Sequence, residues 1–167
     1  EHANLIDRDT IKYMNKKRIW LSPQVLVFKQ EFNGMNADQL AKQRQAYDGL
    51  NDLMTTAKEI GYKNIVFGTD IVTSLKALES TNQELAIRTQ WFSNVEVLRQ
   101  ATSKAGELVG LSGPRNPYGK VGVIEVGALA DILVVDGNPL KDMSVLVQPR
   151  QNLRVIMKGG SVHKNTL

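Results

Sequence analysis

The stretch GALADILVVDGNPL, residues 127–140, is the most informative part of this sequence for its fold. It contains four consecutive apolar residues, Ile132 to Val135, with an aspartate on either side. Such a short apolar run predicts a strand. The Gly137-Asn138-Pro139 segment that follows predicts a turn, because each of these residue types favours turn conformations. The stretch therefore marks a strand and the turn that ends it.

Two further strands are expected downstream of this stretch. Residues 152–158 and 161–164 are separated only by Gly159-Gly160, which suits the tight turn of a hairpin. Upstream, a loop with prolines and glycines over residues 114–122 separates this part from the rest of the chain. The C-terminal part is therefore predicted to be antiparallel and rich in strands.

The residues before that loop show mainly helical patterns. The predicted helices span residues 7–17, 36–60, 83–92 and 93–108, and residues 74–82 are expected to form a loop. Asp7 and Asn36 are the expected N-caps of the first two helices, and Ser93 with Glu96 forms a capping box.

Two short apolar runs, residues 19–21 and 64–67, are predicted to be buried strands. The second follows the long helix after a short turn and ends in Gly68-Thr69-Asp70. This alternation of helix, turn, strand and polar tip is typical of βα units in a parallel sheet.

Composition excludes several classes of protein. The chain has 167 residues, 42% of them hydrophobic and 23% charged, which indicates a globular protein, and no apolar run is long enough to span a membrane. The absence of cysteine excludes disulfides and thiolate metal sites. The net charge of +4 is spread along the chain and aromatic residues make up only 6%, so nucleic-acid binding is not expected. The compartment stays open between cytoplasm and periplasm.

Asp70 and His2 are the candidate functional residues. Asp70 directly follows a predicted strand, where α/β proteins place ligand and catalytic groups, although a turn or N-cap aspartate explains it equally well. His2 is a strand-tip residue or a solvated terminal histidine, and the residues alone favour the second reading, because one histidine makes no metal site. Thr69 and Thr73 are expected to hold the loop around Asp70 by hydrogen bonds.

Other charged residues are expected to be structural. Glu84 and Arg88 are four residues apart on a predicted helix, which is typical of a surface ion pair. Asp131 and Asp136 are expected at turn or edge positions, and His163 on an exposed edge strand.

Several ordered segments together resemble one known family. They are VEVLRQAT (95–102), residues 105–110, residues 122–140, VIMKGG (155–160), Gly68-Thr69-Asp70 and Glu1-His2-Ala3. This series resembles the C-terminal signature of the amidohydrolase superfamily, most closely its imidazolonepropionase-like and prolidase-like (Xaa-Pro dipeptidase-like) members. The resemblance covers nearly the whole chain and is weakest over residues 24–60.

The resemblance implies an α/β fold, the C-terminal part of a (β/α)8 metal-dependent hydrolase barrel plus strands of a small β-sandwich. Residues 1–119 would run from the end of strand 6 through strand 8 and the helices that follow, and residues 120–167 would supply sandwich strands. The family's other metal ligands, on strands 1, 4 and 5, have no counterpart in this sequence. We therefore expect a C-terminal fragment or one chain of a split enzyme, with an incomplete metal site.

The resemblance also implies a reaction and roles for residues. It implies that His2 is a ligand of a divalent metal such as zinc, and that Asp70 binds the metal and serves as base for a metal-activated water. The substrate would be a cyclic amide or a peptide-like amide such as an Xaa-Pro dipeptide, cleaved at its C–N bond. Gln24 and Arg88 are the substrate-binding candidates, with Trp20 as a further one.

The expected partners are the remaining N-terminal part of the same protein, a small amide or dipeptide substrate, and other copies of the chain in a homo-oligomer. No nucleic acid or membrane partner is expected, and the isolated chain is expected to be inactive. The alternative is a non-catalytic interaction or assembly module that reuses the amidohydrolase fold, because a fold does not guarantee an activity.

Overall fold

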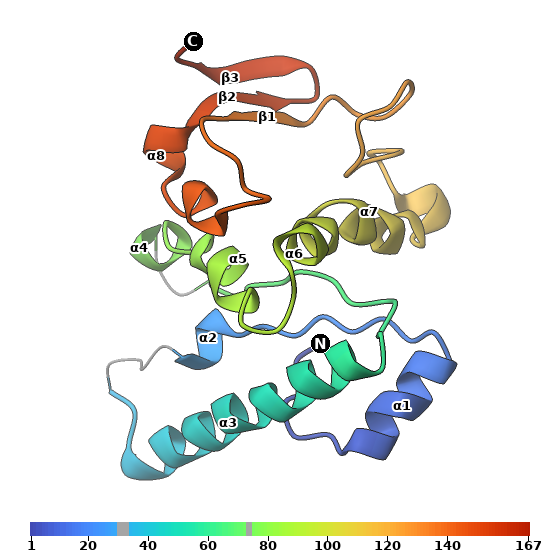
Figure 1. The fold of residues 1–167 in the computed structure, drawn as a ribbon, viewed down its shortest axis with the longest axis vertical. Coiled ribbons are helices and arrows are strands. Elements are labelled where there is room, and N and C mark those ends of the chain that lie inside the picture. The colour runs from blue at the N-terminus through green and yellow to red at the C-terminus, as the bar shows by residue number, and fades with distance from the viewer. Residues whose placement is uncertain (30–33, 73–74) are drawn as a thin grey trace.

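The computed structural model describes residues 1–29, 34–72 and 75–167. Figure 1 shows the chain running from α1 and α3 at one end, through α5, α6 and α7, to a small sheet at the other end. Among the described residues no helix is long and apolar enough to cross a membrane.

The first helices follow the predicted pattern. They are α1 (Arg8–Lys16), α2 (Leu26–Lys29) and α3 (Ala37–Glu59). The Asp7 carboxylate accepts hydrogen bonds from the amides at the start of α1, and Asn36 forms a capping box with Gln39 at the start of α3. Both predicted N-caps are therefore confirmed. Ile11 of α1 and Leu53 of α3 are buried in the same apolar core.

The middle of the chain differs from the prediction in three places, and one of them is that the helix predicted over residues 83–92 ends at Arg88. It contains α4 (Leu75–Leu78), α5 (Gln83–Arg88), α6 (Asn94–Ala101), α7 (Ser103–Gly110) and the 3-10 helix η1 (Gly113–Arg115). The Ser93 capping box is confirmed, but the helix predicted to reach Leu108 breaks at Thr102. Gly122 packs against that break, since a Cβ at Gly122 would lie 2.3 Å from the Thr102 oxygen. The loop predicted over residues 74–82 contains α4, and Ser74 lies outside the described residues.

The two apolar runs before Asp70 lie side by side and parallel, as predicted. Leu21 and Ile65 form a parallel bridge, in which the Leu21 amide donates to the Asn64 oxygen at 2.8 Å and the Val66 amide donates to the Leu21 oxygen at 3.0 Å. Ile19, which was expected to be buried in the first run, is 44% exposed. The described pairing between the two runs is this single bridge, so neither run forms the regular strand that was predicted.

The C-terminal part forms the predicted antiparallel sheet. Its strands are β1 (Ile132–Val135), β2 (Leu153–Lys158) and β3 (Ser161–Asn165), in the order β1-β2-β3, with η2 (Met143–Leu146) and α8 (Pro149–Asn152) between the first two. The Gly159-Gly160 turn has positive φ at both residues, which glycine adopts without steric cost. Met143 and Leu153 join the core formed by the preceding helices, so the sheet packs onto them.

Candidate metal and catalytic site

The structure brings His2 and Asp70 together although they are far apart in the sequence. The His2 Nε2 atom lies 3.6 Å from Asp70 Oδ2, and the two side chains are 42% and 50% exposed. This proximity agrees with the shared metal site that the resemblance implies, while the chemical roles of the two residues stay predictions. Thr69 is partly buried beside Asp70, and Thr73 lies outside the described residues.

The backbone explains why the two side chains meet. The Leu21–Ile65 bridge places the two parallel runs side by side, and the His2 amide donates to the Ser22 oxygen at 3.1 Å. Both candidate residues also have left-handed backbone conformations, with φ of 61° at His2 and 50° at Asp70. Non-glycine residues in this region are strained, and such strain concentrates at functional sites.

The imidazole ring of His2 is held so that one nitrogen is open and the other is covered. Its ring meets the Phe28 ring of α2 edge-on, with centroids 5.4 Å apart. The Nδ1 atom is buried and has no hydrogen-bond partner among the described residues, while Nε2 faces Asp70. The geometry leaves Nε2 available to a ligand that Asp70 also reaches.

Gln24 lies beneath the segment that leads to Asp70. It is 2% exposed, and its Nε2 donates to Glu1 Oε2 at 2.7 Å and to Ser22 Oγ at 3.2 Å. Its Oε1 is buried without a partner among the described residues. Gly68 permits this packing, since a Cβ there would lie 2.9 Å from Gln24 Nε2. Substrate binding by Gln24 stays a prediction.

Arg88 and Glu84 form a buried pair, which corrects the prediction of a surface ion pair. Both side chains are 0% exposed, and Arg88 Nε donates to Glu84 Oε1 at 2.8 Å. Arg88 also donates to the main-chain oxygens of Val66 and Pro23 and to the Gln100 side chain. Burial lowers the pKa of Arg88, and the charge and hydrogen bond of Glu84 oppose that shift.

These contacts place Arg88 inside the protein rather than at an open surface. Its guanidinium bonds to protein groups, and the Phe67 ring lies 5.2 Å from it. This arrangement favours a structural role, and direct substrate contact by Arg88 stays a prediction. Substrate contact by Trp20, which is half-buried and directly precedes Leu21, also stays a prediction.

Glu84, Arg88 and Gln100 form a buried cluster, and the sequence indicated only part of it. The i,i+4 spacing of Glu84 and Arg88 is visible in the chain, but it does not reveal that the pair is buried. Gln100 lies in the VEVLRQAT segment of the family resemblance, but that segment does not reveal its buried contacts, because they depend on α6 packing against the Val66-Phe67 segment.

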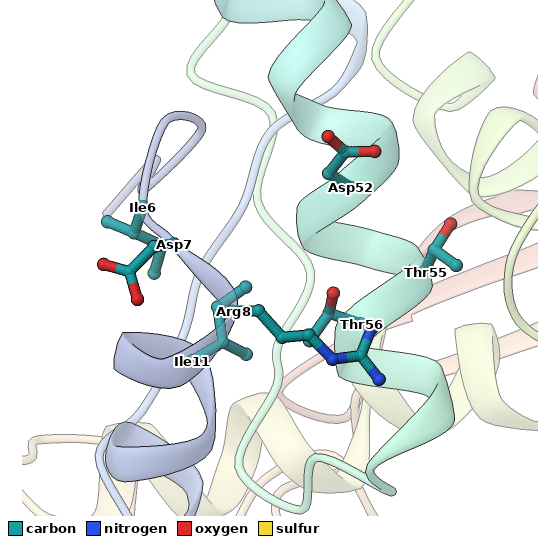
Figure 2. Close-up of a pocket in the computed structure, with 7 residues that line it drawn as sticks. All are labelled: Ile6, Asp7, Arg8, Ile11, Asp52, Thr55 and Thr56. Atoms are coloured by element: carbon teal, nitrogen blue, oxygen red, sulfur yellow. The ribbon is translucent and has the colours of Figure 1, made fainter.

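A pocket of about 310 Å³ between α1 and α3 lies apart from the candidate site (Figure 2). Its lining residues are Ile6, Asp7, Arg8, Ile11, Asp52, Thr55 and Thr56. Asp7 caps α1 and Arg8 pairs with Glu59 at 2.6 Å, so these two charged residues of the lining already have structural roles. Neither His2 nor Asp70 lines it.

The donor chemistry of His2 and Asp70 fits a divalent cation. One imidazole nitrogen and one carboxylate are ligands that zinc accepts, and two such ligands of a tetrahedral ion lie about 3.3–3.6 Å apart. The observed separation of 3.6 Å is consistent with this geometry. No group of three or more potential metal ligands occurs among the described residues.

Comparison with known proteins identifies the family. Residues 1–162 match the amidohydrolase family, and the chain belongs to it. A prolidase solved with N-methylphosphonate-L-proline is 28% identical with a TM-score of 0.84, over 99% of this chain and 40% of its own. An amidohydrolase structure is 29% identical with a TM-score of 0.86, over 99% of this chain and 39% of its own.

A more distant structure shows the same fold. A Xaa-Pro dipeptidase with methionine in its active site is 23% identical, with a TM-score of 0.81 over 98% of this chain and 39% of its own. No curated protein matches the chain significantly. The chain thus spans about 40% of the length of the solved structures it resembles, and its mixed α/β fold matches part of each of them.

Proposed function

We propose that the intact protein containing residues 1–167 is a metal-dependent hydrolase of C–N bonds. The observation that carries this proposal is that His2 and Asp70, which are 68 positions apart in the sequence, meet beside the two segments joined by the parallel Leu21–Ile65 bridge. Membership of the amidohydrolase family supports the same reaction class.

We assign metal binding to both residues and proton transfer to Asp70 alone. His2 Nε2 and an Asp70 carboxylate oxygen would hold the cation, with zinc favoured by this nitrogen and oxygen set. When bound, such an ion polarises a carbonyl group and lowers the pKa of a nearby water. Asp70 would accept the proton of the attacking water and pass it toward the leaving nitrogen, which is general base and then general acid catalysis.

The proposed substrates are cyclic amides and peptide-like amides, including Xaa-Pro dipeptides. The similar prolidase structure with N-methylphosphonate-L-proline supports the second group. The parallel Leu21–Ile65 bridge supports the proposal that residues 1–119 belong to a (β/α)8 barrel, and the β1–β3 sheet supports sandwich strands within residues 120–167.

Replacing Asp70 by alanine in the intact protein tests the function. Because Asp70 would lose both its metal contact and its proton-transfer role, kcat/KM toward Xaa-Pro dipeptides or cyclic amides should fall at least about 100-fold. Circular dichroism should stay unchanged, since the Asp70 side chain is half exposed. The measurement is steady-state hydrolysis on a panel of both substrate groups.

Asp136→Ala is the matched control, because Asp136 also follows a strand but pairs with Arg154 in the C-terminal sheet. It should hydrolyse substrate at the wild-type rate. Near-normal turnover of Asp70→Ala would contradict the assigned role. An intact wild-type protein that neither binds metal nor hydrolyses any of these substrates would favour the non-catalytic module instead.

A further inference from the structure

Arg88 joins the two backbone segments that lead to the candidate site. Its Nη1 donates to the main-chain oxygen of Val66, 3.0 Å away, and its Nη2 donates to that of Pro23. Val66 lies four residues before the candidate carboxylate. Pro23 directly follows Ser22, whose oxygen accepts the amide hydrogen of His2. One guanidinium therefore contacts a segment behind each candidate ligand.

The other members of the cluster act on the same segments. The Glu84 carboxylate accepts hydrogen bonds from the amides of Val25 and Leu26 at 2.7–3.1 Å. Gln100 Oε1 accepts a hydrogen bond from the guanidinium at 2.8 Å, and its main-chain oxygen accepts one from the Phe67 amide at 3.1 Å. The cluster thus bonds to main-chain groups on both segments.

The physical character of the cluster suits positioning better than stabilisation. Glu84 and Arg88 are 0% exposed and Gln100 is 3% exposed. A buried ion pair contributes little net stability compared with apolar side chains of similar volume, because desolvation offsets the attraction between the charges. The planar guanidinium fork nevertheless imposes directions on its hydrogen bonds, which a packed apolar side chain does not.

We propose that Glu84, Arg88 and Gln100 are positioning residues that hold His2 and Asp70 at the separation needed to bind one divalent cation. This inference rests on the proposed function and deepens it. The three residues act through the main chain of residues 66–67, which leads to Asp70, and of residues 23–26, which follow the Ser22 oxygen that accepts the His2 amide hydrogen.

Metal binding tests the proposal independently of turnover. The Zn²⁺ affinity of the intact protein is measured by competition with a chromophoric chelator for wild type, Arg88→Lys and Gln100→Ala. Lysine keeps the charge but loses the fork, so Arg88→Lys should bind Zn²⁺ about tenfold or more weakly, the effect typical of lost support for metal ligands. The visible spectrum of bound Co²⁺ depends on ligand geometry and should also change.

Leu53→Ala is the control for stability. Leu53 lies in the core on α3 and belongs to none of the cluster's hydrogen bonds, so at a temperature where every variant is folded it should bind Zn²⁺ as wild type does. If Arg88→Lys does not fold, Gln100→Ala decides alone, because it leaves the Glu84–Arg88 pair in place.

Two results separate failure of this inference from failure of the proposed function. Wild-type Zn²⁺ affinity and Co²⁺ spectrum in the folded cluster variants would overturn the positioning role, as would an equal loss of affinity in Leu53→Ala. The proposed function survives both results if Asp70→Asn loses Zn²⁺. If Asp70→Asn binds Zn²⁺ like wild type, the proposed metal site is wrong and the positioning role is overturned with it.

Discussion

The strand-end region (residues 1–4, 19–26 and 62–70 with α5) and the C-terminal sheet (β1–β3) differ in what holds their backbones together. In the sheet, neighbouring strands pair with each other along most of their length. In the strand-end region the described parallel pairing is the Leu21–Ile65 bridge, and buried side chains bond to the adjoining main-chain groups.

This difference shows which kind of contact sets the geometry of the candidate site. Within the sheet, β2 and β3 pair through the Gly159-Gly160 turn and β1 pairs with β2 across η2 and α8, in both cases by backbone hydrogen bonds between strands. The strand-end region depends on contacts such as Glu84 with Leu26 and Arg88 with Val66, which join residues 58 and 22 positions apart. Changes to those side chains should therefore affect the site more than changes in the sheet.

The largest effect on stability is expected from Arg88→Met. The change leaves the Glu84 carboxylate buried without its cation, which typically costs about 3–5 kcal/mol in the free energy of unfolding. Urea unfolding measures the loss. Hydrogen exchange should show faster opening at the Val25 and Leu26 amides than in β2.

The double variant Glu84→Gln with Arg88→Met is the control for Arg88→Met. It removes the lone buried charge and should recover part of the lost stability. A loss below about 1 kcal/mol in Arg88→Met would contradict the burial of the pair, and equal acceleration of exchange in β2 would remove the distinction between the two regions.

The next effect tests the packing of α7 against the loop residue Val121. Alanine normally stabilises a helix relative to glycine by about 0.5–1 kcal/mol. At Gly106, however, a Cβ would lie 2.2 Å from the Val121 oxygen, so Gly106→Ala should destabilise the protein by about 1–3 kcal/mol. Thermal unfolding of wild type and Gly106→Ala shows directly whether the substitution lowers or raises stability.

Gly110→Ala provides the matched control within the same helix. A Cβ at Gly110 has nothing within 4 Å, so this variant should gain up to about 1 kcal/mol. If both substitutions stabilise the protein, the close approach of α7 to Val121 is wrong.

A smaller, pH-dependent effect is expected at an exposed pair. Desolvation opposes ionisation of Glu96, but hydrogen bonds from Lys58 and Ser93 outweigh it and lower the pKa of Glu96 from 4.5 to about 2. Glutamine can still fill the capping box. The side chain of Glu96 is 39% exposed and that of Lys58 is 46% exposed. Solvent screening should therefore limit the loss of unfolding free energy in Glu96→Gln to about 1 kcal/mol.

The sign of this pH dependence follows from the lowered pKa of Glu96. The stabilisation is fully present above pH 4.5 and disappears as the pH falls toward 2. The difference in unfolding free energy between wild type and Glu96→Gln should therefore shrink over that interval. Glu107→Gln, which breaks an exposed pair with Lys104 within one helix, should lose less. A difference that grows on acidification would contradict the assignment.

The smallest effect is expected from Lys42→Met. Lys42 and Asp38 have the same i,i+4 spacing as Arg88 and Glu84, but both side chains are 72% exposed. Exposed pairs of this kind contribute at most about 0.5 kcal/mol. Urea unfolding should show a loss of unfolding free energy in Lys42→Met that is several times smaller than the loss in Arg88→Met. Equal losses in the two variants would show that burial does not distinguish them.

Local sequence predicted the elements whose causes are local. Asp7, Asn36 and Ser93 accept hydrogen bonds from amides within a few residues, so their caps were predictable from the chain alone. The Gly159-Gly160 hairpin was predictable for the same reason. The break at Thr102 was not, because it packs against Gly122, which lies far along the chain.

The candidate site was predictable only in part. Asp70 stood out by following a strand and His2 by the family resemblance, but neither observation shows how near the two side chains lie. Gln24 lies beside the candidate site without a demonstrated function, and Arg88 is buried behind it. Burial depends on packing between α5, α6 and the two strand ends, which no local pattern records.

The caps, the hairpin and the family of this protein could be predicted from its sequence, because they depend on neighbouring residues and on the order of short motifs. The tertiary structure was needed to show how near His2 and Asp70 lie and that Glu84 and Arg88 are buried. The physical reason is that both facts depend on contacts between segments that are distant in sequence.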